Sequence, residues 1–200
     1  MELKDINDKI VQCRSCSVRE IIPAPRHGAG STNPDVVVLL DEPDNKALHG
    51  GGGLFYGPAQ ERTMLGKCIE AIFGYQKLST TNLYITSAAK CPGSGTCGPS
   101  MHVVRFCANR FLSEELKALQ PKIVIAVGMT SAMIALEHER TPGSHQVVLE
   151  GYKLFNRVAV HGKVVFAPYP LEIDQWVKEV SKAIGFAKEN IGTQPKDWRW

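Results

Sequence analysis

Four cysteines stand at positions that could together hold a metal ion or a metal cluster. Cys13 and Cys16 form a close pair near the N-terminus, and Cys91 and Cys107 stand on either side of a loop rich in glycine, proline and serine. Thiolate sites are often built in this way, with a short-range pair on one segment and further ligands on a distant segment. The spacing therefore predicts a four-thiolate site that ties the two segments together.

Three further residues bear on this site, and two of them, Cys97 and Lys90, have more than one interpretation. Cys97 lies inside the same loop, where it could replace one of the four ligands or remain a spare thiol. Cys68 falls on the apolar side of an expected helix, which is typical of a buried structural cysteine. Lys90, beside Cys91, could contact a phosphate or extend into solvent. These alternatives stay open at the level of sequence.

The sequence also indicates where such thiols would be found. The N-terminal stretch MELKDINDKI has no signal-peptide pattern, and no apolar run is long enough to span a membrane. We therefore expect a cytoplasmic protein without a membrane partner. Thiols stay reduced in that compartment, so six cysteines indicate metal binding more than disulfide bonds.

The overall composition is that of a soluble globular protein. Of its 200 residues, 44% are hydrophobic and 22% are charged, which is enough apolar material for a substantial core. The net charge of +3 permits a polyanionic partner but does not by itself indicate one.

Strand and helix patterns alternate along the chain. Apolar runs at 35–40 and 122–128 predict strands that are buried on both faces, a shorter strand is expected at 83–85, and 158–166 predicts a hairpin. Helices are expected at 3–12, 60–74, 101–119, 130–136 and 172–190. This order predicts a single-domain, three-layer α/β/α fold with a mostly parallel central sheet and a site at the carboxyl ends of the strands.

From Cys13 to about Leu171 the chain resembles the iron–sulfur uracil-DNA glycosylases, families 4 and 5 of their superfamily, and family 4 most closely. The family's opening CxxC matches the first cysteine pair, and its DVVLVGEAPG matches DVVVLLDEPD at 35–44. Its GRPFVG and VYITNVVKC match GGLFYG at 52–57 and LYITSAAKC at 83–91, and its RPKVIVALGxTAA matches QPKIVIAVGMTSA at 120–132.

The resemblance implies a [4Fe–4S] cluster on Cys13, Cys16, Cys91 and Cys107, with a structural role rather than a redox role. A zinc ion held by the same four thiolates is the alternative. It further implies a uracil-DNA glycosylase-like domain over 1–190, followed by a tail at 191–200. The implied partner is single- or double-stranded DNA with a flipped base, bound by a monomer.

Several residues of the implied active site depart from the family pattern. Asp41 replaces the family's motif-one glutamate and Leu40 the glycine before it, whereas Phe55 retains the aromatic residue that stacks on the base. Ser87 replaces the asparagine that reads the edge of uracil, and Tyr169 replaces the histidine of a His-Pro motif. We expect Asp41 and Tyr169 to be catalytic, and the other three to bind the base.

These replacements change the expected chemistry. An asparagine amide matches the donor and acceptor of uracil together, whereas the single hydroxyl of Ser87 cannot, so base selection should be weaker or aimed elsewhere. The phenol of Tyr169 can still donate a hydrogen bond to the departing base. Losing one well-placed donor typically slows such a reaction by about 100- to 1000-fold, which predicts slow rather than absent activity.

The sequence thus leads to a DNA glycosylase of base excision repair that hydrolyses the N-glycosidic bond of uracil or a related deaminated or modified base. Two alternatives remain. One is a nucleic-acid binding module that has kept the fold and lost catalysis, and the other is a similar enzyme acting on a different modified base or nucleoside.

Overall fold

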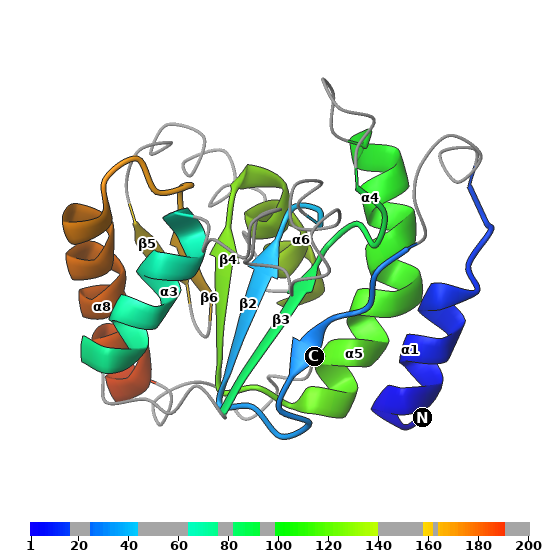
Figure 1. Ribbon diagram of the computed structural model, residues 1–200, viewed down its shortest axis with the longest axis horizontal. Coiled ribbons are helices and arrows are strands. Elements are labelled where there is room, and N and C mark those ends of the chain that lie inside the picture. Colours follow the sequence, from blue (N-terminus) through cyan, green and yellow to red (C-terminus); the bar gives the residue numbers. More distant parts are fainter. Residues whose placement is uncertain are drawn as a thin grey trace.

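The computed structural model describes residues 1–16, 25–43, 64–75, 82–92, 99–139, 158–161 and 164–190. Within this part of the chain, a sheet of six strands runs in the order β1-β3-β2-β4-β6-β5 (Figure 1). The strands are β1 Ala29–Gly30, β2 Val36–Leu40, β3 Leu83–Ser87, β4 Ile123–Val127, β5 Ala159–His161 and β6 Val164–Ala167.

The four inner strands are parallel, and the two edge strands are antiparallel to their neighbours. β2 pairs in parallel with β3 and with β4, and β4 pairs in parallel with β6. β1 and β5 each pair antiparallel with the strand beside them. The carboxyl ends of β2, β3, β4 and β6 therefore meet at one edge of the sheet, where α/β proteins commonly place their sites.

Helices cover both faces of the sheet (Figure 1). On one face lie α3 Met64–Tyr75 and α8 Ile173–Asn190, and the other is covered by α4 Met101–Cys107, α5 Ser113–Leu119 and α6 Met129–Glu139. α1 Leu3–Val11 packs beside α5. The predicted three-layer α/β/α fold with a mostly parallel sheet is confirmed.

The alternation of side chains along β2 explains why the sheet has two cores. Val36, Val38 and Leu40 pack into the cluster formed with α3 and α8, whereas Val37 and Leu39 pack into the cluster on the α4–α6 side. Successive residues of a strand point to opposite faces, so a strand that is covered twice must be apolar at every position. All five residues of β2 are buried.

The structure refines several of the predicted elements. Residues 29–30, where no strand was predicted, form the edge strand β1. The helix expected over 101–119 contains a π-helical segment, η3 Ala108–Leu112, between α4 and α5. The strand expected at 83–85 extends to Ser87. Among the described residues, no helix has the length and apolarity needed to cross a membrane.

Candidate functional site

Asp41 lies directly after β2 and binds the first turn of α6. Its Oδ1 accepts a hydrogen bond from the backbone N–H of Ser131 at 2.6 Å. Gly128, in the turn between β4 and α6, has φ +102, and a Cβ atom there would come within 2.5 Å of Asp41 Oδ2. The turn thus needs glycine both for its backbone angle and for space beside the carboxylate. Asp41 therefore joins the end of β2 to the start of α6.

Burial raises the pKa of the Asp41 carboxyl above its ordinary value, because a partly desolvated carboxylate is harder to ionise. Hydrogen bonds from the Ser131 backbone and hydroxyl and from the Thr130 backbone oppose this shift by stabilising the charged form. The balance leaves a carboxyl group that takes up a proton more readily than an exposed aspartate does.

Leu40 and Ser87 lie opposite each other on paired strands, and both side chains are buried. The register joins Leu40 to Ser87, with relative exposures of 3% and 2%. Leu40 belongs to the core cluster on the α3 and α8 face, so its side chain packs inside the protein rather than facing an open pocket. Phe55, the predicted stacking residue, lies outside the described residues.

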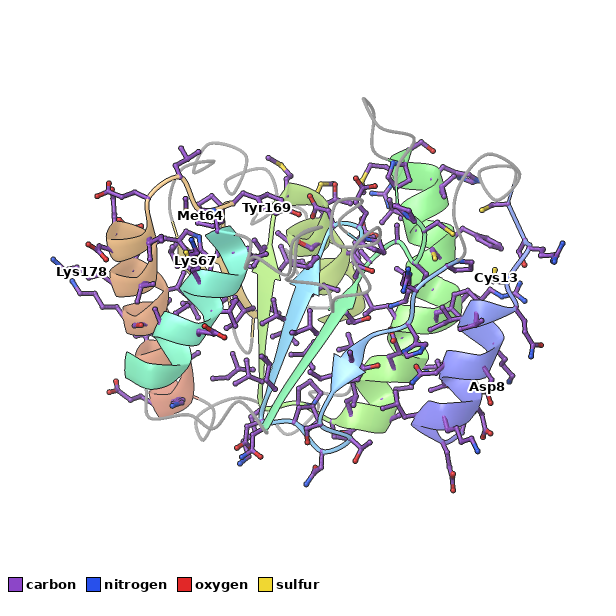
Figure 2. The ribbon with its side chains drawn as sticks, in the orientation of Figure 1. Asp8, Cys13, Met64, Lys67, Tyr169 and Lys178 are labelled. Atoms are coloured by element: carbon purple, nitrogen blue, oxygen red, sulfur yellow. The ribbon has the colours of Figure 1, made fainter. Side chains whose placement is uncertain are left out.

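Tyr169 lies on the loop that follows β6, at the same end of the sheet as Asp41, and is 48% exposed. The loop is anchored to α8, because Trp176 of that helix donates its indole N–H to the carbonyl oxygen of Pro168 at 2.6 Å. Figure 2 places Tyr169 at the end of the sheet where Met64 begins α3. Leu171, two residues further on, is 92% exposed.

The four predicted thiolate ligands lie around one pocket. Cys13, Cys16, Cys91 and Cys107 all line it, and none of the four is in a disulfide. Cys107 Sγ accepts a hydrogen bond from the backbone N–H of Lys90 at 3.3 Å. In Figure 2, Cys13 lies at the far flank of the molecule from Tyr169. The structure thus brings four cysteines from three separate segments to one pocket, and their binding of a metal stays a prediction.

Packing of α1 brings the N-terminal cysteines to this pocket. Ile6 and Ile10 form a small apolar cluster with Phe111 of η3, and Cys13 and Cys107 pack against that cluster. Burial raises the pKa of the Cys107 thiol, while the backbone N–H and the charge of Lys90 act in the opposite direction. Among the described residues, no three His, Cys, Asp or Glu side chains already form a group that could hold a single metal ion.

Comparison with models of known protein families identifies the family of this chain. Residues 27–190 match the family described as the uracil DNA glycosylase superfamily. The chain belongs to the uracil DNA glycosylase superfamily. A search of curated proteins found no match. The match begins after Cys13 and Cys16, so the assignment to the iron–sulfur families within this superfamily remains a prediction.

Superfamily membership supports a glycosylase-type hydrolase that acts on DNA. In this member, the carboxyl edge of the sheet carries the predicted Asp41 and Tyr169. It also carries residues that the sequence analysis did not single out: Glu42, one of whose carboxylate oxygens is buried, and the exposed Leu171. Of these two, only Leu171 had a usable signal in the sequence, as a large apolar residue directly after Pro170 in a loop.

Proposed function

We propose that this superfamily member is a DNA glycosylase that flips uracil, or a related deaminated or modified base, out of DNA and hydrolyses its N-glycosidic bond. The product would be an abasic site for base excision repair. The observation that carries the proposal is the shared position of Asp41 and the anchored Tyr169 loop at the carboxyl edge of the sheet. A carboxylate and a hydrogen-bond donor at one edge are what this hydrolysis needs.

Each group has a distinct proposed task. Asp41 positions the attacking water or stabilises the positive charge that develops on the sugar, using the carboxylate oxygen that Ser131 does not occupy. Tyr169 donates its phenolic proton in a hydrogen bond to the departing base, which leaves with negative charge. Phe55 stacks on the base, whereas Ser87 and Leu40, which are buried at the ends of β3 and β2, support this edge of the sheet from within rather than contact the base.

Leu171 fits a further requirement of this reaction. A glycosylase must open the base stack, and proteins that deform DNA often insert an apolar side chain between base steps. An almost fully exposed leucine on a loop anchored by Trp176 is suited to that task, because the loop can hold the wedge in place. We therefore assign Leu171 the role of a wedge that occupies the space left by the flipped base.

The cysteine pocket is proposed to hold a [4Fe–4S] cluster. Four thiols from three segments line one pocket without forming disulfides and fit this group, and the largely apolar lining of the pocket suits a cluster shielded from solvent. Each thiolate of such a cluster binds a different iron, so its ligands stand farther apart than those of one zinc ion. The cluster would hold the N-terminal segment against the loop at Cys91, far from the reacting base.

Excision from oligonucleotides tests the catalytic proposal. Protein purified without oxygen is given DNA with one uracil, either single-stranded or paired with guanine or adenine, and strand cleavage at abasic sites is measured. We expect slow excision that is lost in the combined variant Asp41→Asn and Tyr169→Phe. Lys178→Ala, on the exposed side of α8, is the matched control and should excise like the wild type.

Iron analysis tests the cluster proposal separately. Wild-type protein should contain iron and sulfide in a cluster ratio, Cys13→Ser should lose both, and Cys97→Ser should keep both. Zinc instead of iron in the wild type would select the alternative metal. Iron loss in Cys97→Ser with retention in Cys13→Ser would show that the ligand set is wrong.

Two observations favour a second candidate function, a DNA-binding module without catalysis. Asp41 already uses one carboxylate oxygen to bind the first turn of α6, and the Ser87 side chain is buried. Both features are as compatible with a structural role for this edge of the sheet as with a catalytic role. Tight binding to DNA without release of any base from a panel of modified bases and nucleosides would select the module. Release of a base other than uracil would select the related enzyme.

A further inference from the structure

A buried ion pair lies directly beneath the cysteine pocket. Lys90 and Glu115 have relative side-chain exposures of 1% and 0%, and the lysine ammonium contacts a glutamate carboxylate oxygen. The ammonium also donates to Thr86 Oγ1 at 2.7 Å and to the Ser87 carbonyl oxygen at 2.8 Å. Lys90 therefore neither extends into solvent nor reaches a phosphate, and both interpretations of it from the sequence were wrong.

The glutamate is held as completely as the lysine. Thr86 Oγ1 lies 3.2 Å from both carboxylate oxygens of Glu115, and the Tyr84 hydroxyl donates to one of them at 3.4 Å. The Thr86 hydroxyl can thus accept from Lys90 while it donates to Glu115. Burial and the nearby Glu115 charge raise the pKa of Tyr84, which keeps its hydroxyl protonated as a donor.

The same lysine is also part of the pocket wall. Its backbone N–H donates to Cys107 Sγ, its carbonyl oxygen accepts from the Arg26 N–H at 2.7 Å, and Cys91 is the next residue. Glu115 and Cys107 lie on one helical run, formed by α4, η3 and α5. Lys90 thus contacts this run twice, with its amide at Cys107 and with its ammonium at Glu115.

Stability alone is a weak reason to retain such a pair, because apolar residues of similar size often replace a buried ion pair without loss. We propose that Lys90 and Glu115 are positioning residues of the thiolate site. Their contact fixes the loop so that the Lys90 amide donates to Cys107 and Cys91 faces the pocket. The inference rests on the proposed cluster and goes beyond it.

The rate of iron release measures how well Lys90 and Glu115 position the thiolate ligands. Full-length protein purified without oxygen is mixed with a ferrous chelator, and the rate of iron release is followed by absorbance. The main variant is Lys90→Met combined with Glu115→Leu, which removes both charges together and so leaves neither of them buried alone. Partners that orient metal ligands typically change affinity by about 10- to 100-fold, so we expect release to accelerate by about that factor.

A control variant and a second measurement distinguish loss of ligand positioning from loss of the folded structure. Arg105→Gln breaks the exposed Arg105–Glu137 pair on the same helix as Cys107, and it should release iron at the wild-type rate. Circular dichroism checks that the double variant is folded at the assay temperature. Its cluster should also have a more negative reduction potential, because the hydrogen bond from the Lys90 amide to Cys107 Sγ favours the reduced state and a displaced loop would lose it.

Two outcomes would overturn the inference in distinguishable ways. A folded, iron-loaded double variant with wild-type release and potential would show that the pair has no positioning role, while the cluster proposal stands. Wild-type protein without iron would remove the cluster proposal and this inference together. Neither outcome bears on base excision, which the oligonucleotide assay measures separately.

Discussion

Substitution of Asp41 separates its structural contact from its chemistry. Asparagine keeps an oxygen that can accept from the Ser131 N–H but carries no charge, whereas alanine removes both the oxygen and the charge. The contact resembles a helix N-cap supplied from another strand, at 2.6 Å in a half-buried setting. Loss of such a cap lowers the free energy of unfolding by about 1 kcal/mol, within a range of roughly 0.5–2 kcal/mol.

The raised pKa of Asp41 gives the sign of the charge effect. A carboxyl group whose pKa is higher in the folded state stabilises the fold fully below its unfolded pKa, near 3.8, and that contribution is lost as pH rises through the folded pKa. Each unit of difference is worth about 1.4 kcal/mol. At pH 7 we therefore expect Asp41→Asn to be at least as stable as the wild type, with the advantage shrinking below pH 4.

Urea unfolding followed by circular dichroism at pH 3.5 and pH 7 provides the measurement. Asp41→Ala should be about 1 kcal/mol less stable than Asp41→Asn at both pH values. An Asp41→Asn variant clearly less stable than the wild type at pH 7 would refute the reasoning, because the carboxylate charge would then be favourable. In the excision assay, the folded Asp41→Asn should lose about 100-fold or more if the carboxylate takes part in the reaction.

Three other predictions follow from single contacts. Gly128→Ala should lower the free energy of unfolding by about 2 kcal/mol in urea, and adding Asp41→Ala should recover part of it, because the atoms nearest the new methyl group are then gone. Trp176→Phe should lower the free energy of unfolding by about 1 kcal/mol, because the Pro168 carbonyl loses its hydrogen-bond donor. It should also slow excision, because the Tyr169 loop loses its anchor, and unchanged excision would mean that the loop needs no such anchor. Leu171→Ala should leave the thermal midpoint unchanged, as expected for a 92% exposed side chain, while it weakens excision from duplex DNA more than from single strands.

Much of the fold could be predicted because its signals are local. The apolar runs that became β2 and β4 are long enough to indicate double burial, and the helices between them carry their own periodicity. β1 was missed because a strand of two residues has no pattern of its own and exists only through pairing with β3. The π-helical segment between α4 and α5 likewise has no signal in the sequence.

The candidate site was predictable in part. The spacing of the cysteines and the family resemblance singled out Cys13, Cys16, Cys91 and Cys107, which line one pocket, while Cys97 stayed an alternative and lies outside the described residues. The motifs place Asp41 and Tyr169 just after parallel strands, and the carboxyl ends of such strands meet at one edge of the sheet. Their position at the same edge could therefore be predicted. The same positions could not tell that Leu40 and Ser87 are buried, since a strand residue's environment depends on which elements cover it.

The sequence by itself determined the layered α/β fold and the superfamily, because periodicity, motif order and residue type are all properties of short segments. Only the tertiary structure decided the partners of Asp41 and Lys90. Asp41 binds the first turn of a helix far along the chain, and Lys90 is neutralised by Glu115 from another element. From the sequence alone, a charged side chain near the end of a strand is expected to be exposed to solvent. Only the packing of other elements supplies the hydrogen-bonding or oppositely charged partner that allows such a side chain to be buried.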